Sequence, residues 1–219
     1  MKIQGTRAAC TLLAAAALAG GLSACVPLVM GGAAVGTMVA VDRRTSGTQL
    51  EDEGIEIRAM NRVNEIAGER AHVNATSWNR QVLLTGEVPT AEDRQKIEQA
   101  VLGVENVRST VNELVVAPNS TLSQRSNDTY ITGKVKAGIV DAKDLTSPAF
   151  KVVTERGVVY LMGRVSQREA TRATEIARSV NGVLKVVRVF EIISEDELRR
   201  GGYAPTQPAP VVRDPAAAS

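Results

Sequence analysis

Two similar stretches decide the fold of this chain: Val82-Leu83-Leu84-Thr85-Gly86-Glu87-Val88 and Val159-Tyr160-Leu161-Met162-Gly163-Arg164-Val165. In both, apolar residues alternate around a single glycine, which is the pattern of a β-strand. We expect the glycines, Gly86 and Gly163, to permit close packing or a bulge, not to bind phosphate. The sequence therefore predicts an internal repeat in which these strands occupy equivalent places.

Helix signals follow each of these strands. Thr90 is a candidate N-cap in the first copy, and Ser166-Gln167-Arg168-Glu169 has the form of a capping box in the second. Each helix is expected to end near a Gly-Val pair, with the glycine as C-cap. The pairs are residues 103–104 and 182–183, and the final strands are expected over 107–116 and 184–193.

A helix and a strand also precede each of the two stretches. The helices are expected over 55–66 and 128–140, and the strands over 73–76 and 150–153, with turns at 77–80 and 155–157. Each copy is therefore α-β-β-α-β, and the fold class is α+β with a three-stranded mixed sheet covered by two helices. The second helix would join neighbouring strands by a right-handed crossover. Because such small units are marginally stable alone, we expect the copies to pack together.

The beginning of the chain carries the pattern of an exported lipoprotein. Lys2 and Arg7 precede an apolar stretch over residues 11–21, and Leu22-Ser23-Ala24-Cys25 follows. We expect Cys25 to carry the lipid after cleavage before it, and two or more acyl chains give stable anchoring at about 0.8 kcal/mol per buried CH₂. The alternative is an ordinary secretory signal that a cysteine follows by chance.

The expected organisation follows from these elements. The apolar, glycine-rich segment 27–41 is shorter than the roughly 20 residues that span a bilayer as a helix. Residues 45–47 are interpreted as linker, and the Pro- and Ala-rich end lacks an apolar core pattern. The expected parts are a signal peptide (1–24), a lipidated linker (25–47), the first repeat (48–117), the second (118–195), and a helical extension with a disordered tail (196–219).

The scarcity of cysteine and histidine limits the chemistry. The sequence has 2 cysteines and 1 histidine. Cys10 is expected to leave with the signal, and Cys25 is expected to carry the lipid. This excludes a thiolate site and a multi-histidine site in the mature protein. A catalytic triad could use only His72, which lies in a strand-like alternation and is more often structural in such a place. We therefore expect no enzyme, no catalytic residue, no metal and no cofactor.

Charge divides unevenly between the two copies. Lys2 and Arg7 leave with the signal, so the 26 basic residues become 24 against 24 acidic ones. Residues 26–119 hold 9 basic and 13 acidic side chains, whereas residues 120–200 hold 14 basic and 10 acidic ones. The second copy is therefore the better candidate for contact with an anionic surface.

The repeat resembles the BON domain, and the chain resembles outer-membrane lipoproteins with two BON domains. The resemblance covers most of residues 41–193. It is carried by Ser126-Asn127-Asp128-Thr129-Tyr130-Ile131-Thr132, Leu161-Met162-Gly163, Arg168-Glu169-Ala170, Val180-Asn181-Gly182-Val183, Asp42-Arg43-Arg44-Thr45 and Asp52-Glu53. Resemblance to bacterial lipoproteins also implies sorting to the outer membrane, because Val26 and not Asp follows Cys25.

The resemblance implies a binding function. It implies a lipid-anchored protein that faces the periplasm, supports outer-membrane integrity and accumulates at division sites. It also implies that the first helix of the second domain binds anionic phospholipid such as phosphatidylglycerol or cardiolipin. That helix corresponds here to residues 128–140, with Tyr130 where the family usually has Trp. Nucleic acid is not an expected partner.

The helix pattern agrees with this implication. Ile131, Val135 and Ile139 recur every four residues and predict a core-facing side. Tyr130, Lys134 and Ala137 are then expected to point outward, as a membrane interface requires. Lys136 adds attraction to anionic headgroups. The alternative is that Tyr130 packs between the domains and the lysines are only solvated.

A second function remains open from the sequence. The domains would then form a periplasmic structural adaptor for an envelope protein or for peptidoglycan, and the lipid would serve only as a tether. The acidic first copy suits this role. The two functions are compatible, one in each domain.

Overall fold

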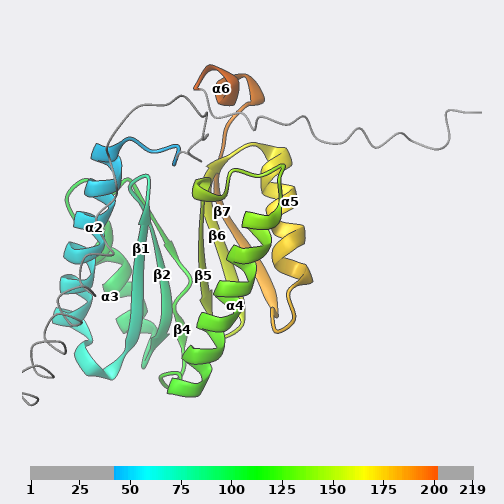
Figure 1. Ribbon diagram of the computed structural model, residues 1–219. Helices are drawn as coiled ribbons and strands as arrows, with labels where there is room; N and C mark the ends of the chain where they lie inside the picture. The colour runs from blue at the N-terminus through cyan, green and yellow to red at the C-terminus, as the bar shows by residue number, and fades with distance from the viewer. Residues whose placement is uncertain (1–41, 202–219) are drawn as a thin grey trace, which may run out of the picture. The chain divides into compact units, whose positions relative to one another are not determined.

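The structure is a computed structural model that describes residues 42–201, which belong to one compact unit. Figure 1 shows two α/β layers, each with its own sheet and helices. The predictions for the signal peptide, for Cys25, for the segment 27–41 and for the tail beyond residue 201 lie outside the described residues.

The first repeat pairs helix α2 with a small mixed sheet. Helix α2 (Ser46–Ile66) is followed by a 3-10 turn, η2 (Gly68–Arg70). Strands β1 and β2 then form an antiparallel hairpin, and after α3 the short strands β3 and β4 both pair with β2 in parallel. The remaining bounds are β1 (His72–Trp78), β2 (Gln81–Val88), α3 (Ala91–Leu102), β3 (Ser109–Asn112) and β4 (Val115–Val116).

The edge of the first sheet differs from the prediction. A single strand over 107–116 is wrong, because the pairing with β2 stops after Asn112 and resumes at Val115. Between them Leu114 turns inward and is 1% exposed. Burial of this leucine explains why the strand breaks at that point.

The second repeat has the same order of elements with a continuous edge. Strands β5 and β6 are antiparallel, and β7 runs parallel to β6 over its whole length. The bounds are α4 (Leu122–Asp141), η3 (Ser147–Ala149), β5 (Phe150–Glu155), β6 (Val158–Val165), α5 (Gln167–Ser179), β7 (Lys185–Ile192) and α6 (Glu195–Arg200). The predicted α-β-β-α-β order and the α+β class are confirmed.

Several helices begin or end at other residues than predicted. Helices α2 and α4 begin at Ser46 and Leu122 because Thr45 and Thr121 act as N-caps, so the expected linker at 45–47 is in fact a helix start. Thr90 and Ser166 are N-caps as predicted. Gly103 is the C-cap of α3. Gly182 is not a cap: α5 ends at Ser179, and Gly182 lies in the following turn with φ +99°.

Gly86 and Gly163 sit where two backbones approach closely. A Cβ at Gly86 would lie 2.0 Å from the carbonyl oxygen of His72, and one at Gly163 would lie 2.3 Å from that of Ala149. Gly86 also has φ +113°. The expectation of close packing is therefore confirmed at both positions.

Alternate residues of the first sheet face two different hydrophobic cores. Val82 and Leu84 face the helices of the first repeat, whereas Leu83 points to the opposite side of the sheet. There it joins Tyr160 and Met162 of β6 in a shared cluster, which also contains Trp78 and Val189. The expected packing of one repeat on the other is confirmed.

Candidate functional site

Helix α4 forms from a strong start and a regular core face. Thr121 and Gln124 make a reciprocal capping box, which satisfies two backbone N–H groups at the helix start. Ile131, Val135 and Ile139 are at most 1% exposed and pack on the sheet of the second repeat. The predicted core face of this helix is thus confirmed, and the opposite face is left to solvent.

The solvent face of α4 is unusually apolar. Leu122, Tyr130 and Val140 are 80%, 65% and 64% exposed. Ala137 is also exposed, and Gly133 lies on the same side. At about 100° per residue, these five residues fall within one stripe along the helix. We call Leu122, Tyr130, Gly133, Ala137 and Val140 the α4 stripe.

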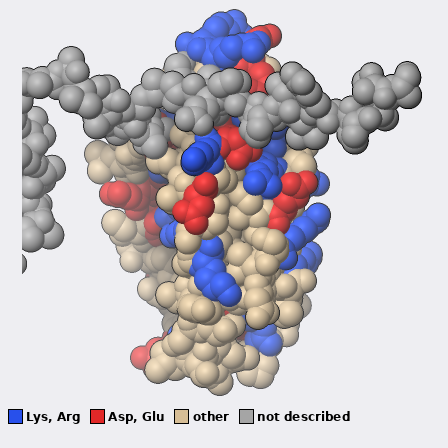
Figure 2. Space-filling model, turned by 45° about the vertical axis from the view of Figure 1, so that its right-hand side comes forward, with Lys and Arg blue, Asp and Glu red and all other residues tan. Residues whose placement is uncertain are grey.

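Lysines border the α4 stripe on both sides. On the helical wheel Lys134 and Lys136 lie roughly 80° to either side of its centre. The Lys134 ammonium stands 5.1 Å from the Tyr130 ring centroid, which is cation–π range. Figure 2 looks toward the side of the molecule where α4 and α5 lie, and shows Lys and Arg side chains, with Asp and Glu side chains between them, among broad uncharged areas.

The four predicted residues lie together on α4. Tyr130 and Ala137 belong to the α4 stripe, Lys134 is half-buried beside the ring, and Lys136 is exposed on the other border. Leu122 and Val140 also belong to the α4 stripe and were not predicted as site residues. The Thr121-x-x-Gln124 box could have revealed the earlier helix start and, with it, Leu122.

His72 lies in β1, as the alternation predicted, and it contacts acidic groups. Its Nδ1 is 3.0 Å from Glu87 Oε2 and 3.3 Å from Ser120 Oγ. A Ser-His-acid triad needs the serine and the carboxylate on different ring nitrogens. Because both contacts are to Nδ1, the geometry does not form a triad.

Burial and charge shift the acids beside His72 in opposite directions. Burial, reinforced by the charge of Glu87, raises the pKa of Glu155. Burial also opposes ionisation of Glu87, but hydrogen bonds from Ser120, His72 and Arg156 outweigh it and lower its pKa. Glu87 is therefore a well-satisfied carboxylate, whereas Glu155 is not.

Both repeats match the model of a known protein family. The family model described as "BON domain" matches residues 58–118 and again residues 127–194. This chain belongs to the BON-domain family. Each match covers most of one structural repeat, so the two α-β-β-α-β units are two BON domains, and the resemblance deduced from the sequence is confirmed.

Related proteins extend this result. The chain is 39% identical to the outer membrane lipoprotein DolP of Haemophilus influenzae, over 78% of this chain and 90% of that protein. It is 34% identical to a 21 kDa hemolysin of Actinobacillus pleuropneumoniae, over 70% of this chain and 80% of that protein. The predicted type, a dual-BON outer-membrane lipoprotein, and its location are thereby confirmed, and the family points to a non-catalytic protein.

A solved structure of the C-terminal domain of CdsD from Chlamydia trachomatis aligns with 63% of this chain and 98% of its own, at a TM-score of 0.28 and 11% identity. Among the helices of residues 42–201, none combines the length and the apolar character needed to cross a membrane.

Proposed function

We propose that this BON protein binds anionic phospholipid through the α4 stripe, while a lipid on Cys25 holds it at the outer membrane. Its membrane targets are bilayers rich in phosphatidylglycerol or cardiolipin. Through this contact it supports outer-membrane integrity, including at division sites. The roles in integrity and division rest on the family resemblance, and the lipid contact rests on α4.

The observation that carries the proposal is the exposure of three large apolar side chains on one helix face. An isolated apolar residue on a surface is ordinary, but an aligned stripe indicates a binding surface. Tyr130 suits the headgroup level, where aromatic rings with a polar tip concentrate. Leu122 and Val140 would then reach the acyl boundary, as the apolar face of an interfacial helix does.

Charge supports the same orientation. Lys134 and Lys136 border the α4 stripe, so both ammonium groups would meet the headgroups when the stripe is buried. Each basic residue near an anionic surface contributes roughly 1 kcal/mol. The excess of 14 basic over 10 acidic residues in residues 120–200 adds longer-range attraction, which salt screens.

Vesicle binding tests the proposal. The compact unit from residue 39 to 219 lacks the acyl chains, so its binding to phosphatidylglycerol or cardiolipin vesicles reports the folded domains alone. We expect salt-sensitive binding, with NMR amide shifts concentrated in residues 122–141. Lys134→Glu reverses one charge and should weaken binding about 30-fold, and Tyr130→Ala about tenfold.

Lys96→Glu is the matched control, because it makes the same charge change on α3 of the first domain. Its binding should stay close to that of the unaltered protein. Unchanged binding in both Tyr130→Ala and Lys134→Glu would contradict the assignment to α4. Absence of any vesicle binding would contradict the phospholipid function itself.

A structural adaptor is the second candidate, and an observation on α2 favours it. Leu50 and Ile57 are 71% and 64% exposed and lie seven residues apart, on one helix face of the acidic first domain. This face suits an envelope protein as partner better than an anionic bilayer.

The double variant Leu50→Asp, Ile57→Asp tests the adaptor in cells. It should raise the sensitivity of the cells to detergent without changing vesicle binding. Detergent resistance equal to that of cells with the unaltered protein would count against the adaptor.

A further inference from the structure

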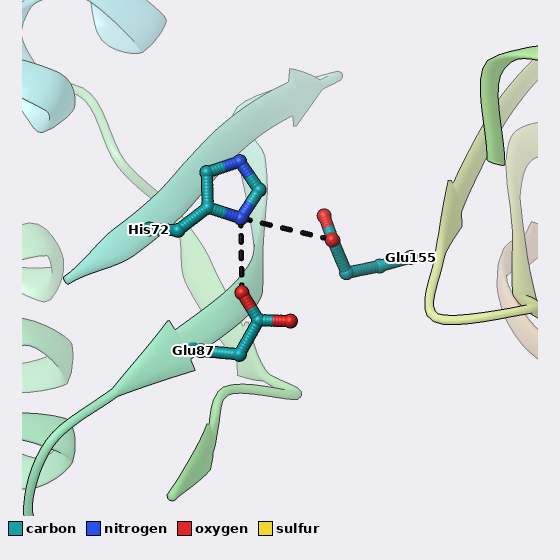
Figure 3. Close-up of side chains that lie close together, drawn as sticks. All are labelled: His72, Glu87 and Glu155. Atoms are coloured by element: carbon teal, nitrogen blue, oxygen red, sulfur yellow. Dashed lines mark hydrogen bonds and ion pairs between the residues drawn. The ribbon is translucent and has the colours of Figure 1, made fainter. Parts of the chain in front are cut away.

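His72, Glu87 and Glu155 bring three ligand atoms together from both BON domains. His72 and Glu87 are direct cross-strand partners on β1 and β2, and Glu155 ends β5 in the other sheet. Figure 3 shows the three side chains pointing toward one another. All three ligand atoms lie within 4.8 Å of one another.

The distances suit a small metal ion. Zinc binds imidazole nitrogen and carboxylate oxygen at about 2.0–2.2 Å, so two ligands of a tetrahedral site are roughly 3.3 Å apart. His72 Nδ1 is 3.0 Å from Glu87 Oε2 and 3.7 Å from Glu155 Oε1. These two separations bracket the tetrahedral value. The ligand oxygens of Glu87 and Glu155 lie within 4.8 Å of each other, so the carboxylates would rotate toward each other to hold one ion.

One ligand atom is left without a hydrogen bond. Glu155 is only 7% exposed, and its Oε2 accepts a bond from Asn74 Nδ2. Among residues 42–201, Oε1 has only the 3.7 Å contact to His72, which is too long for a hydrogen bond. Glu155 Oε1 borders the cleft beside His72, so it is free to bind a cation there, and a metal between Glu155 and Glu87 would offset the charge of both carboxylates.

The surroundings hold the ligands in place. Glu87 is fully buried, its Oε1 receives Arg156 Nη1 at 3.3 Å, and its Oε2 receives the backbone N–H of Ser120 at 3.1 Å. Asn74 orients Glu155 in the same way. Such outer hydrogen bonds fix the direction of metal ligands. Arg125 Nε donates to Ser120 Oγ, and among residues 42–201 Arg125 forms no ion pair with Glu155.

Solvent reaches the cluster. A cleft of about 280 Å³ is lined by His72, Asn74, Asp128 and Glu155, among others. It gives an ion a path of entry and has room for water as a fourth ligand. Since His72 is partly exposed while both glutamates are buried, the open position would lie on the cleft side.

We infer that His72 Nδ1, Glu87 Oε2 and Glu155 Oε1 form a zinc site that joins the two BON domains. The mixed imidazole and carboxylate ligands favour zinc over calcium or magnesium, which prefer oxygen alone. Two ligands come from the first domain and one from the second, so the bound ion would link the two sheets.

Zinc binding to the full lipoprotein tests this inference. The protein, without a polyhistidine tag, is purified in detergent, stripped with a chelator and titrated with zinc chloride by calorimetry. We expect one zinc per chain and a zinc-dependent rise in the melting temperature. X-ray absorption should show only nitrogen and oxygen ligands, near 2.0–2.2 Å.

Variants connect the binding to these residues. Glu155→Gln and His72→Gln should each lower zinc affinity at least about tenfold, and Glu53→Gln, the same change at an exposed position, should leave it unaltered. Melting without zinc verifies that each variant folds. The inference is overturned if the unaltered protein binds no stoichiometric zinc, or if both ligand variants bind it equally well.

Discussion

Two buried aspartates hold the hairpin turns of the two domains. Asp52 of α2 accepts hydrogen bonds from the backbone N–H groups of Asn79 and Arg80, both at 2.8 Å. Asp128 of α4 accepts equivalent bonds at the other hairpin, also at 2.8 Å. Both turn residues of each hairpin have positive φ, and the carboxylate gives their N–H groups a charged acceptor.

Replacement of Asp52 should therefore destabilise the first domain. Asp52→Ala leaves two turn N–H groups and the hydroxyl of Ser77 without their acceptor, and we expect a loss of about 3 kcal/mol in the free energy of unfolding. Urea denaturation measures this loss. Glu53→Ala, next to it but exposed, should change little; similar losses in both variants would contradict the role of the turn contacts.

The helices and strands could be predicted where they depend on residues that are close in sequence. Alternation around Gly86 and Gly163 and the capping box at Ser166 predicted strands and helices because each depends on neighbours in sequence. The break in the edge of the first sheet was not predictable, because it depends on burial of Leu114 by distant residues. Likewise, helical periodicity predicted that Tyr130, Lys134 and Ala137 lie away from the core face of α4, but nothing in the sequence brings Glu155 to His72.

Two glycines should respond oppositely to alanine. Gly86→Ala places a Cβ 2.0 Å from a backbone oxygen at φ +113°, and we expect it to cost at least about 2 kcal/mol. Gly133 lies inside α4 with no atom within 4 Å of an added Cβ, so Gly133→Ala should stabilise by about 0.5–1 kcal/mol. Thermal unfolding distinguishes them; equal effects would contradict the close approach at β1 and β2.

At the scale of the whole molecule, a buried ion pair fastens the start of the fold to the second domain. Arg43 donates two hydrogen bonds to Glu169 of α5, at 2.7 and 2.8 Å, and one to the carbonyl oxygen of Arg164. Both side chains are fully buried. The chain thus contacts the second domain before it enters α2 of the first.

Breaking this pair should be costly. Arg43→Met leaves a buried carboxylate without its partner, and we expect a loss of about 3–5 kcal/mol in the free energy of unfolding. Arg62→Met removes an exposed ion pair with Glu65 and should cost little. A double-mutant cycle with Glu169→Gln measures the coupling; additive effects would show that the two side chains act independently.

The position of Arg43 also limits how far the folded domains can lie from a lipid on Cys25. From Cys25 to Arg43 the chain can extend roughly 60 Å at most, and its far end is fixed to the domain that carries α4. With a lipid on Cys25, encounter of the α4 stripe with the same bilayer is intramolecular and is governed by effective concentration. For the phospholipid contact that we propose, a weak affinity of α4 would then be sufficient, and the domain would stay free to sample changing lipid composition within that radius.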